Sequence, residues 1–83
     1  MSKRDKCETG EFLKMVERVI QAAVPRVGNG DGAELAALAR LRDQVEWAIA
    51  DAIAMQLQEG KSWANIGLAL GTSRQAAHKR YTR

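Results

Sequence analysis

Apolar residues recur at helical spacing along most of the chain, and no stretch shows the strict alternation of a β-strand. The pattern predicts an all-α fold with four helices at about residues 11–24, 33–59, 62–70 and 73–81. Pro25 is expected to end the first helix near Val24, because proline in a helix interior lacks a backbone donor. Residues 28–32 are glycine-rich and predict a loop, after which Asp31 or Gly32 starts the second helix.

The predicted helix at residues 33–59 carries more apolar surface than one covering layer needs. One stripe consists of Leu35, Leu38, Leu41, Val45, Ile49, Ala52 and Ile53. A second line begins halfway along the helix and consists of Trp47, Ala50, Ala54 and Leu57. A surface helix is normally apolar on one side only, so we expect this helix to be covered twice. The simplest second cover is another copy of the protein, so we predict a homodimer built on the first two helices, with the second line at its interface. The alternative is that helices of the same chain cover both lines.

Charge divides the sequence into unequal parts. Residues 61–83 contain five Lys or Arg and no acid, whereas residues 1–60 carry a formal charge of −2, for a net charge of +3. A cationic segment at one end predicts a polyanionic partner there. We therefore expect a flexible arm at residues 1–10, a helical dimerisation region at residues 11–60 and a cationic helix pair at residues 61–83. The arm is expected to be a frayed terminus, and the alternative is a basic arm that touches nucleic acid.

The helix pair at residues 61–83 has the features of a helix-turn-helix. Ser62 is a predicted N-cap, and Gly71 supplies the turn, where positive φ favours glycine. Ser73 is the next predicted N-cap, with Thr72 as the alternative if a Thr72–Gln75 capping box forms. The expected contacts between the two helices involve Ile66, Leu70, Ala77 and Tyr81, with Gly67 and Ala77 small where the helices approach closely.

The other face of the last helix carries side chains suited to DNA. The predicted base contacts are Arg74, Gln75, Ala76 and His78. The predicted phosphate contacts are Lys61, Ser62, Thr72, Ser73, Lys79 and Arg83. His78 faces either a base or a phosphate, and Arg80 points either to DNA or to an acid of the long helix. Trp63 is expected to pack within the protein, although it could stack on nucleic acid.

The stretch from Ser62 to Tyr81, Ser-Trp-Ala-Asn-Ile-Gly-Leu-Ala-Leu-Gly-Thr-Ser-Arg-Gln-Ala-Ala-His-Lys-Arg-Tyr, resembles the helix-turn-helix of small actinobacterial and phage regulators. The pattern of those proteins runs roughly Ser-Trp-x-x-Ile-Gly-x-x-Leu-Gly-x-Ser-Arg-Gln-Ala-Ala-x-x-Arg-Tyr. The stretch is similar, more loosely, to the DNA-reading region of sigma factors. The resemblance implies that Arg74, Gln75, His78 and Lys79 face the DNA groove. Thr72 departs from the pattern, because Val or Ile usually packs under the turn at that position.

These features predict a sequence-specific regulator of transcription that binds double-stranded DNA as a homodimer, most simply a repressor that blocks a promoter. The alternatives are a module that docks on RNA polymerase or another DNA-bound factor, and a weakly specific architectural DNA-binding protein. We expect no enzyme activity, metal, other cofactor or small-molecule ligand, because the chain has one Cys, one His and no acidic pair in an apolar setting. No apolar run reaches the length of a membrane span, so we expect no membrane partner and a cytoplasmic, nucleoid-associated location.

Overall fold

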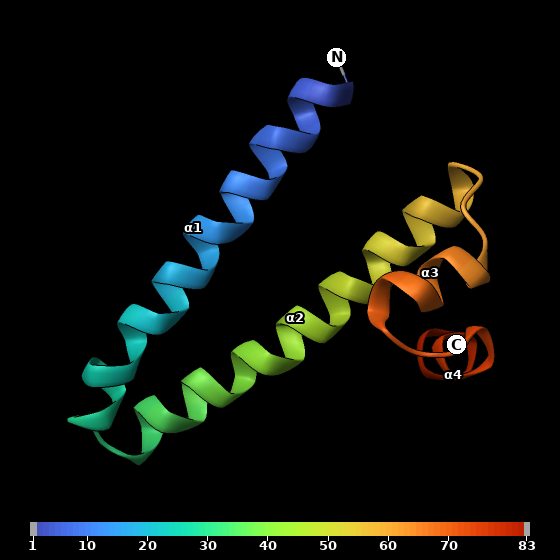
Figure 1. The fold of residues 1–83 in the computed structure, drawn as a ribbon. Helices are drawn as coiled ribbons and strands as arrows, with labels where there is room; N and C mark the ends of the chain where they lie inside the picture. The colour runs from blue at the N-terminus through green and yellow to red at the C-terminus, as the bar shows by residue number, and fades with distance from the viewer. Residues whose placement is uncertain (1, 83) are drawn as a thin grey trace. The chain divides into compact units, whose positions relative to one another are not determined.

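The computed structural model describes residues 2–82 of the chain, with side chains for residues 8–82. The described residues form four helices and no strand (Figure 1): α1 (Ser2–Gly28), α2 (Gly32–Gln58), α3 (Trp63–Leu70) and α4 (Arg74–Tyr81). The predicted all-α fold is therefore confirmed. The chain divides into two compact units, of which the first ends at Leu41 and the second begins at Arg42, so that the division falls within α2.

The first helix begins earlier than predicted. α1 starts at Ser2 and not near residue 11, so its backbone includes residues that we expected to form an arm. No proline precedes Pro25, and Gly10 inside a helix costs only about 1 kcal/mol relative to alanine. The polar composition of this segment was therefore a poor guide to the start of the helix, since nothing in it forbids helical backbone.

The first helix also ends later than predicted. α1 continues through Pro25 and ends at Gly28, whereas we expected it to fade near Val24. Proline cannot donate a hydrogen bond back along the helix, but its carbonyl can still accept one. The Pro25 carbonyl accepts from the backbone N–H of Asn29 at 3.1 Å and from the side-chain amide of Asn29 at 2.9 Å. These two hydrogen bonds close the last turn after the proline.

A reciprocal cap starts α2 at the predicted place. The Asp31 carboxylate accepts from the backbone N–H of Glu34 at 3.0 Å, and the Glu34 carboxylate accepts from the backbone N–H of Asp31 at 3.1 Å. The pair satisfies donors that a helix N-terminus leaves without partners, and both negative charges lie at the positive end of the helix dipole. This cap fixes where the chain leaves the turn after α1.

Glycines in the left-handed conformation end the next two helices. Gly60 follows α2 with φ of 101°, and Gly71 follows α3 with φ of 71°. In each case the residue after the glycine donates to the carbonyl four residues before the glycine, at 3.0 Å after Gly60 and 2.9 Å after Gly71. Both ends therefore have the Schellman arrangement, which reverses the chain within a few residues.

Serine side chains start the two short helices. Ser62 caps α3 by accepting from the backbone N–H of Asn65 at 3.2 Å, and the Asn65 side chain accepts from the backbone N–H of Ser62 in return. Ser73 caps α4 by accepting from the backbone N–H of Ala76 at 3.0 Å. The predicted N-caps are confirmed at both positions, and the alternative start at Thr72 is not adopted.

The core of the C-terminal unit is small and contains one residue from each of three helices. Ile53 of α2, Ile66 of α3 and Ala77 of α4 are buried together. Half-buried residues surround them, namely Ile49, Leu57, Trp63 and Tyr81. The predicted inward position of Leu70 is wrong, because its side chain is exposed. Leu70 is the last residue of α3 and faces small alanines of α4, which leave a hollow beside it and do not cover it.

Helices α3 and α4 approach closely at Gly67, as predicted. A Cβ atom at this position would lie 3.0 Å from the backbone nitrogen of Arg74 and 3.0 Å from the carbonyl carbon and oxygen of Ser73. These are backbone atoms at the start of α4, so they cannot move aside as a flexible side chain would. Glycine at position 67 therefore sets the distance at which α4 rests on α3.

We expect Gly67→Ala to destabilise the C-terminal unit by up to about 2 kcal/mol. Alanine is favoured over glycine in a helix by about 1 kcal/mol, but overpacking against fixed backbone costs about 1–3 kcal/mol and outweighs that gain. Thermal unfolding followed by circular dichroism measures the change. Gly10→Ala is the matched control, because a Cβ atom there meets nothing within 4 Å and the substitution should be neutral or stabilising. A Gly67→Ala protein as stable as the wild type would contradict the close approach.

Candidate nucleic-acid interface

Burial of Ala77 determines which face of α4 is left for a partner. Ala77 lies against α3 in the core, and the side chains of Arg74, Gln75 and His78 line one shallow surface hollow of about 330 Å³. All three are exposed, and so is Ala76. The four residues predicted to contact bases are therefore all accessible, and three of them lie together. An exposed set of one guanidinium, one amide and one imidazole can donate to and accept from base edges.

The predicted phosphate contacts among the described residues lie at the surface, near the start of α3 or α4 except for Lys79, which is in the last turn of α4. Lys61, Thr72 and Lys79 are exposed, as are the two N-cap serines, Ser62 and Ser73. The serine hydroxyl oxygens already accept from backbone N–H groups, so phosphate contact there would rely on hydroxyl protons or on the helix N-termini. The Ser62 hydroxyl also donates to the Asn65 side chain at 2.8 Å. Arg83 lies outside the described residues.

Trp63 packs within the protein, as predicted, and positions the single histidine. The Trp63 side chain is half-buried against the core. The edge of one ring meets the face of the other between Trp63 and His78, with centroids 5.0 Å apart and planes at 71°. This arrangement is the one that aromatic rings favour. It holds the imidazole at the accessible face of α4 while the indole remains part of the packing.

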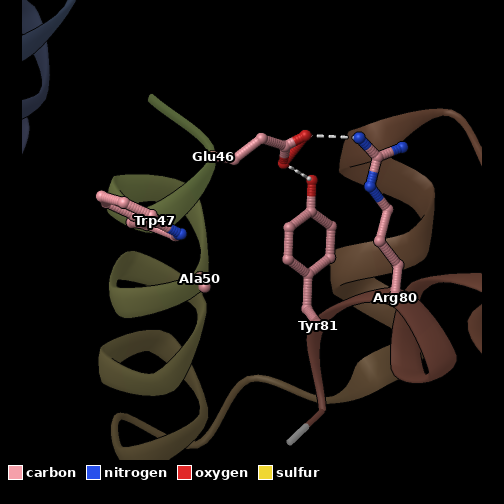
Figure 2. Close-up of a pocket in the computed structure, with 5 residues that line it drawn as sticks. All are labelled: Glu46, Trp47, Ala50, Arg80 and Tyr81. Carbon is pink, nitrogen blue, oxygen red and sulfur yellow. Dashed lines mark hydrogen bonds and ion pairs between the residues drawn. The ribbon is translucent and has the colours of Figure 1, made fainter. Parts of the chain in front are cut away.

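Arg80 does not share the accessible face, because it pairs with an acid of α2. Its guanidinium forms an ion pair with Glu46, and the Tyr81 hydroxyl donates to the same carboxylate at 3.0 Å. Figure 2 shows both side chains of α4 converging on Glu46. The Arg80 guanidinium also lies 5.4 Å from the centre of the Tyr81 ring. Of the two predicted orientations for Arg80, the one toward an acid of the long helix is therefore confirmed.

The shared carboxylate perturbs all three ionisable groups. Hydrogen bonds from Arg80 and then from Tyr81 lower the pKa of Glu46. The same carboxylate raises the pKa of the Arg80 guanidinium. Burial raises the pKa of the Tyr81 phenol, and the hydrogen bond to Glu46 raises that pKa further. The contact fixes the end of α4 on α2. The sequence alone did not identify Glu46 as the acid involved. Its position three and seven residues before Ile49 and Ile53 was the available signal, because that spacing places it on the core side of the helix.

We expect the stabilising effect of Glu46 to depend on pH. A carboxylate whose pKa is lowered in the folded state stabilises that state above its ordinary pKa of 4.5, and the effect disappears as the pH falls through the folded pKa. Glu46→Gln should therefore be less stable than the wild type at neutral pH and should match it in acid. Urea unfolding followed by tryptophan fluorescence measures the difference at each pH.

Asp51, an exposed acid of α2, provides the control for these pH measurements. Asp51→Asn removes a carboxylate from the same helix and is expected to change stability little at any pH. A gap between wild type and Glu46→Gln that stays constant into acid would mean that the carboxylate charge at position 46 does not stabilise the fold.

The predicted dimer residues are not equally available. Trp47 and Ala54 are exposed, and Ala50 is half-buried beside Tyr81 (Figure 2). Leu57 packs against the core of its own chain. Helices α3 and α4 therefore cover one side of this part of α2 and leave Trp47 and Ala54 outside the core.

Three cations remain for a polyanion in the described part of the C-terminal unit. No carboxylate of the described residues pairs with Lys61, Arg74 or Lys79, and all three are exposed. The pairing of Arg80 with Glu46 thus separates a structural arginine from accessible cations that can meet phosphate or base edges. The N-termini of α3 and α4 follow the exposed caps Ser62 and Ser73, and backbone N–H groups at a helix N-terminus favour anions.

Comparison with known proteins adds no further assignment. No family model matches the chain, and no significant match was found to a curated protein or to a solved structure. None of the helices formed by the described residues is both long and apolar enough to cross a membrane.

Proposed function

We propose that the protein is a sequence-specific regulator of transcription that binds double-stranded DNA as a homodimer and inserts α4 into the major groove. The observation that carries the proposal is the division of α4 into two faces. One face is anchored by Ala77 and by the contacts of Arg80 and Tyr81 with Glu46. The other face exposes the hollow lined by Arg74, Gln75 and His78.

The exposed residues have distinct roles in this proposal. Gln75 pairs with adenine and Arg74 with guanine through two hydrogen bonds each. Ala76 lines the hollow beside Leu70 instead and has no role in this reading. His78 contacts a base or a phosphate. The phosphates are held by Lys61, Lys79 and the N-cap regions of α3 and α4, and by Arg83. Two copies would read half-sites about 34 Å apart, one helical turn of DNA.

The regulatory outcome follows from occupancy of the site. A dimer bound across a promoter blocks access of the polymerase, so repression is the simplest consequence. Such a protein would act in the cytoplasm, on the nucleoid. A module that only docks on polymerase would not depend on the base-facing side chains of α4, and an architectural protein would lack a preferred sequence. Substitutions on α4 separate these possibilities.

We expect Gln75→Ala to relax base preference at one position of each half-site, at a cost of about 1–3 kcal/mol for the preferred base. Lys79→Ala should weaken binding to all sequences alike, because phosphates carry no sequence information. Fluorescence anisotropy against a set of duplexes that differ at one base pair each measures both effects. Unchanged preference in Gln75→Ala would show that this side chain does not read DNA.

A further inference from the structure

The N-terminal unit leaves a row of large apolar side chains uncovered. Phe12, Met15 and Val19 of α1 are all exposed, and so is Ala22. The four residues follow one another at spacings of three, four and three, so they form a single line along the helix. We call this line the α1 seam. An exposed apolar line of this kind normally marks a contact surface.

The residues that flank the α1 seam on either side are oppositely charged. The same spacing leads back from Phe12 to Glu8 and forward from Ala22 to Arg26. The extended line therefore begins with an acid, continues through four apolar residues and ends with a base. Repetition at three and four residues is the pattern with which two helices interlock side by side.

The pattern is complementary to itself when a second copy of α1 runs in the opposite direction. If two copies of α1 lie antiparallel so that Met15 is opposite the partner's Val19, then Phe12 is opposite the partner's Ala22 in the same register. The largest side chain of the seam thus meets the smallest, which lets the helices approach closely. In this register Glu8 is opposite the partner's Arg26, so that an ion pair closes each end. A parallel arrangement would place like residues, and hence like charges, at the same level.

Other apolar residues of α1 are divided between solvent and its own chain, and Leu13, Ile20 and Val24 are exposed. Ala23 and Val27 are half-buried and line a groove with Leu38 and Leu41 of α2 in the N-terminal unit. Ala23 follows Val19 by four residues and therefore borders the α1 seam, whereas Val27 lies farther round the helix. Arg26 also lines this groove. The four residues of the α1 seam do not line this groove and are exposed, so they remain accessible to a second copy.

We propose that the α1 seam is a two-fold interface at which α1 of a second copy packs antiparallel, with Phe12 over the partner's Ala22. The proposal deepens the homodimer of the proposed function by naming the surface that joins its two copies. The interface is self-complementary, as a two-fold contact requires, because each residue pair occurs twice. Its two ion pairs select the antiparallel register over the parallel one.

Mass measurement on the full chain tests the interface. Sedimentation equilibrium should give the wild type twice its 9.1 kDa mass at micromolar concentration, and Phe12→Asp should raise the dissociation constant at least tenfold. Leu13→Asp is the matched control, because Leu13 is 58% exposed against 56% for Phe12 but lies off the seam. A monomeric wild type, or equal loss of the dimer in the two variants, would overturn the proposal.

Charge reversal keeps the test valid if Phe12→Asp disturbs folding. Glu8→Arg and Arg26→Glu should each weaken the dimer, and the double variant should restore it, since the pairs reform with opposite sign. Failure of the double variant to recover would contradict the antiparallel register. Duplex binding is scored separately. A dimer that depends on Phe12 but binds no duplex would refute the proposed function and leave the interface standing.

Discussion

Replacing Ile66 with alanine should destabilise the C-terminal unit by about 2–5 kcal/mol. Ile66 is only 3% exposed and is one of three buried residues that join α2, α3 and α4. Ile53 is the only other large side chain among the three, so truncating Ile66 removes a large part of the buried core. Because small domains are stable by only a few kcal/mol, we expect much of this unit to unfold and α4 to lose its fixed position.

Urea unfolding followed by tryptophan fluorescence measures this loss, since Trp47 and Trp63 both belong to the C-terminal unit. Leu68→Ala is the matched control, because it truncates a comparable side chain of the same helix that is 82% exposed. We expect it to change stability by less than about 0.5 kcal/mol. Similar losses in the two variants would mean that the core is not where the structure places it.

Salt should weaken duplex binding about a thousandfold between 50 and 200 mM. If Lys61, Lys79 and Arg83 each neutralise one phosphate in both copies of a dimer, the logarithm of the affinity falls with a slope of about −5 against the logarithm of salt concentration. A fourfold increase in salt then lowers the affinity by about 10³. Binding titrations at a series of salt concentrations measure the slope.

The same titrations on Lys79→Ala provide the internal check. Removing one phosphate contact from each copy should make the slope shallower by about 2. Affinity that does not change with salt would contradict phosphate contact and favour a protein partner for this face. An unchanged slope in Lys79→Ala would remove that residue from the proposed interface.

Local features of the fold were predictable because short-range chemistry determines them. Ser62 and Ser73 cap the short helices, and Gly71 turns the chain between them. The need for glycine at position 67 was also visible in the sequence, because two helices joined by a short turn must approach near that point. These predictions depend on residues within one or two helical turns of each other.

Features that depend on compensation or on distant residues were not predictable in the same way. The first helix continues past Pro25 and ends with Asn29 donating twice to the proline carbonyl, and composition does not reveal that pairing. Leu70 was expected inside, but its burial depended on the size of the facing residues of α4.

The candidate site likewise combines features that the sequence predicts with features that it does not. Accessibility of Arg74, Gln75 and His78 followed from the period of the helix once Ala77 was taken as buried. The identity of the acid that holds Arg80 did not, because Glu46 lies 34 residues away in sequence. That carboxylate reaches the end of α4 only because α4 packs against α2.

Selection of bound sequences from a pool of random duplexes would show whether α4 reads DNA. In the proposed function, the exposed face of α4 reads base edges in the major groove as part of a dimer. We expect a recovered motif with two-fold symmetry and half-sites about 34 Å apart. When the selection is repeated with Gln75→Ala, preference at one position of each half-site should be lost. Recovery of no motif, or of one that Gln75→Ala leaves intact, would contradict the proposed function.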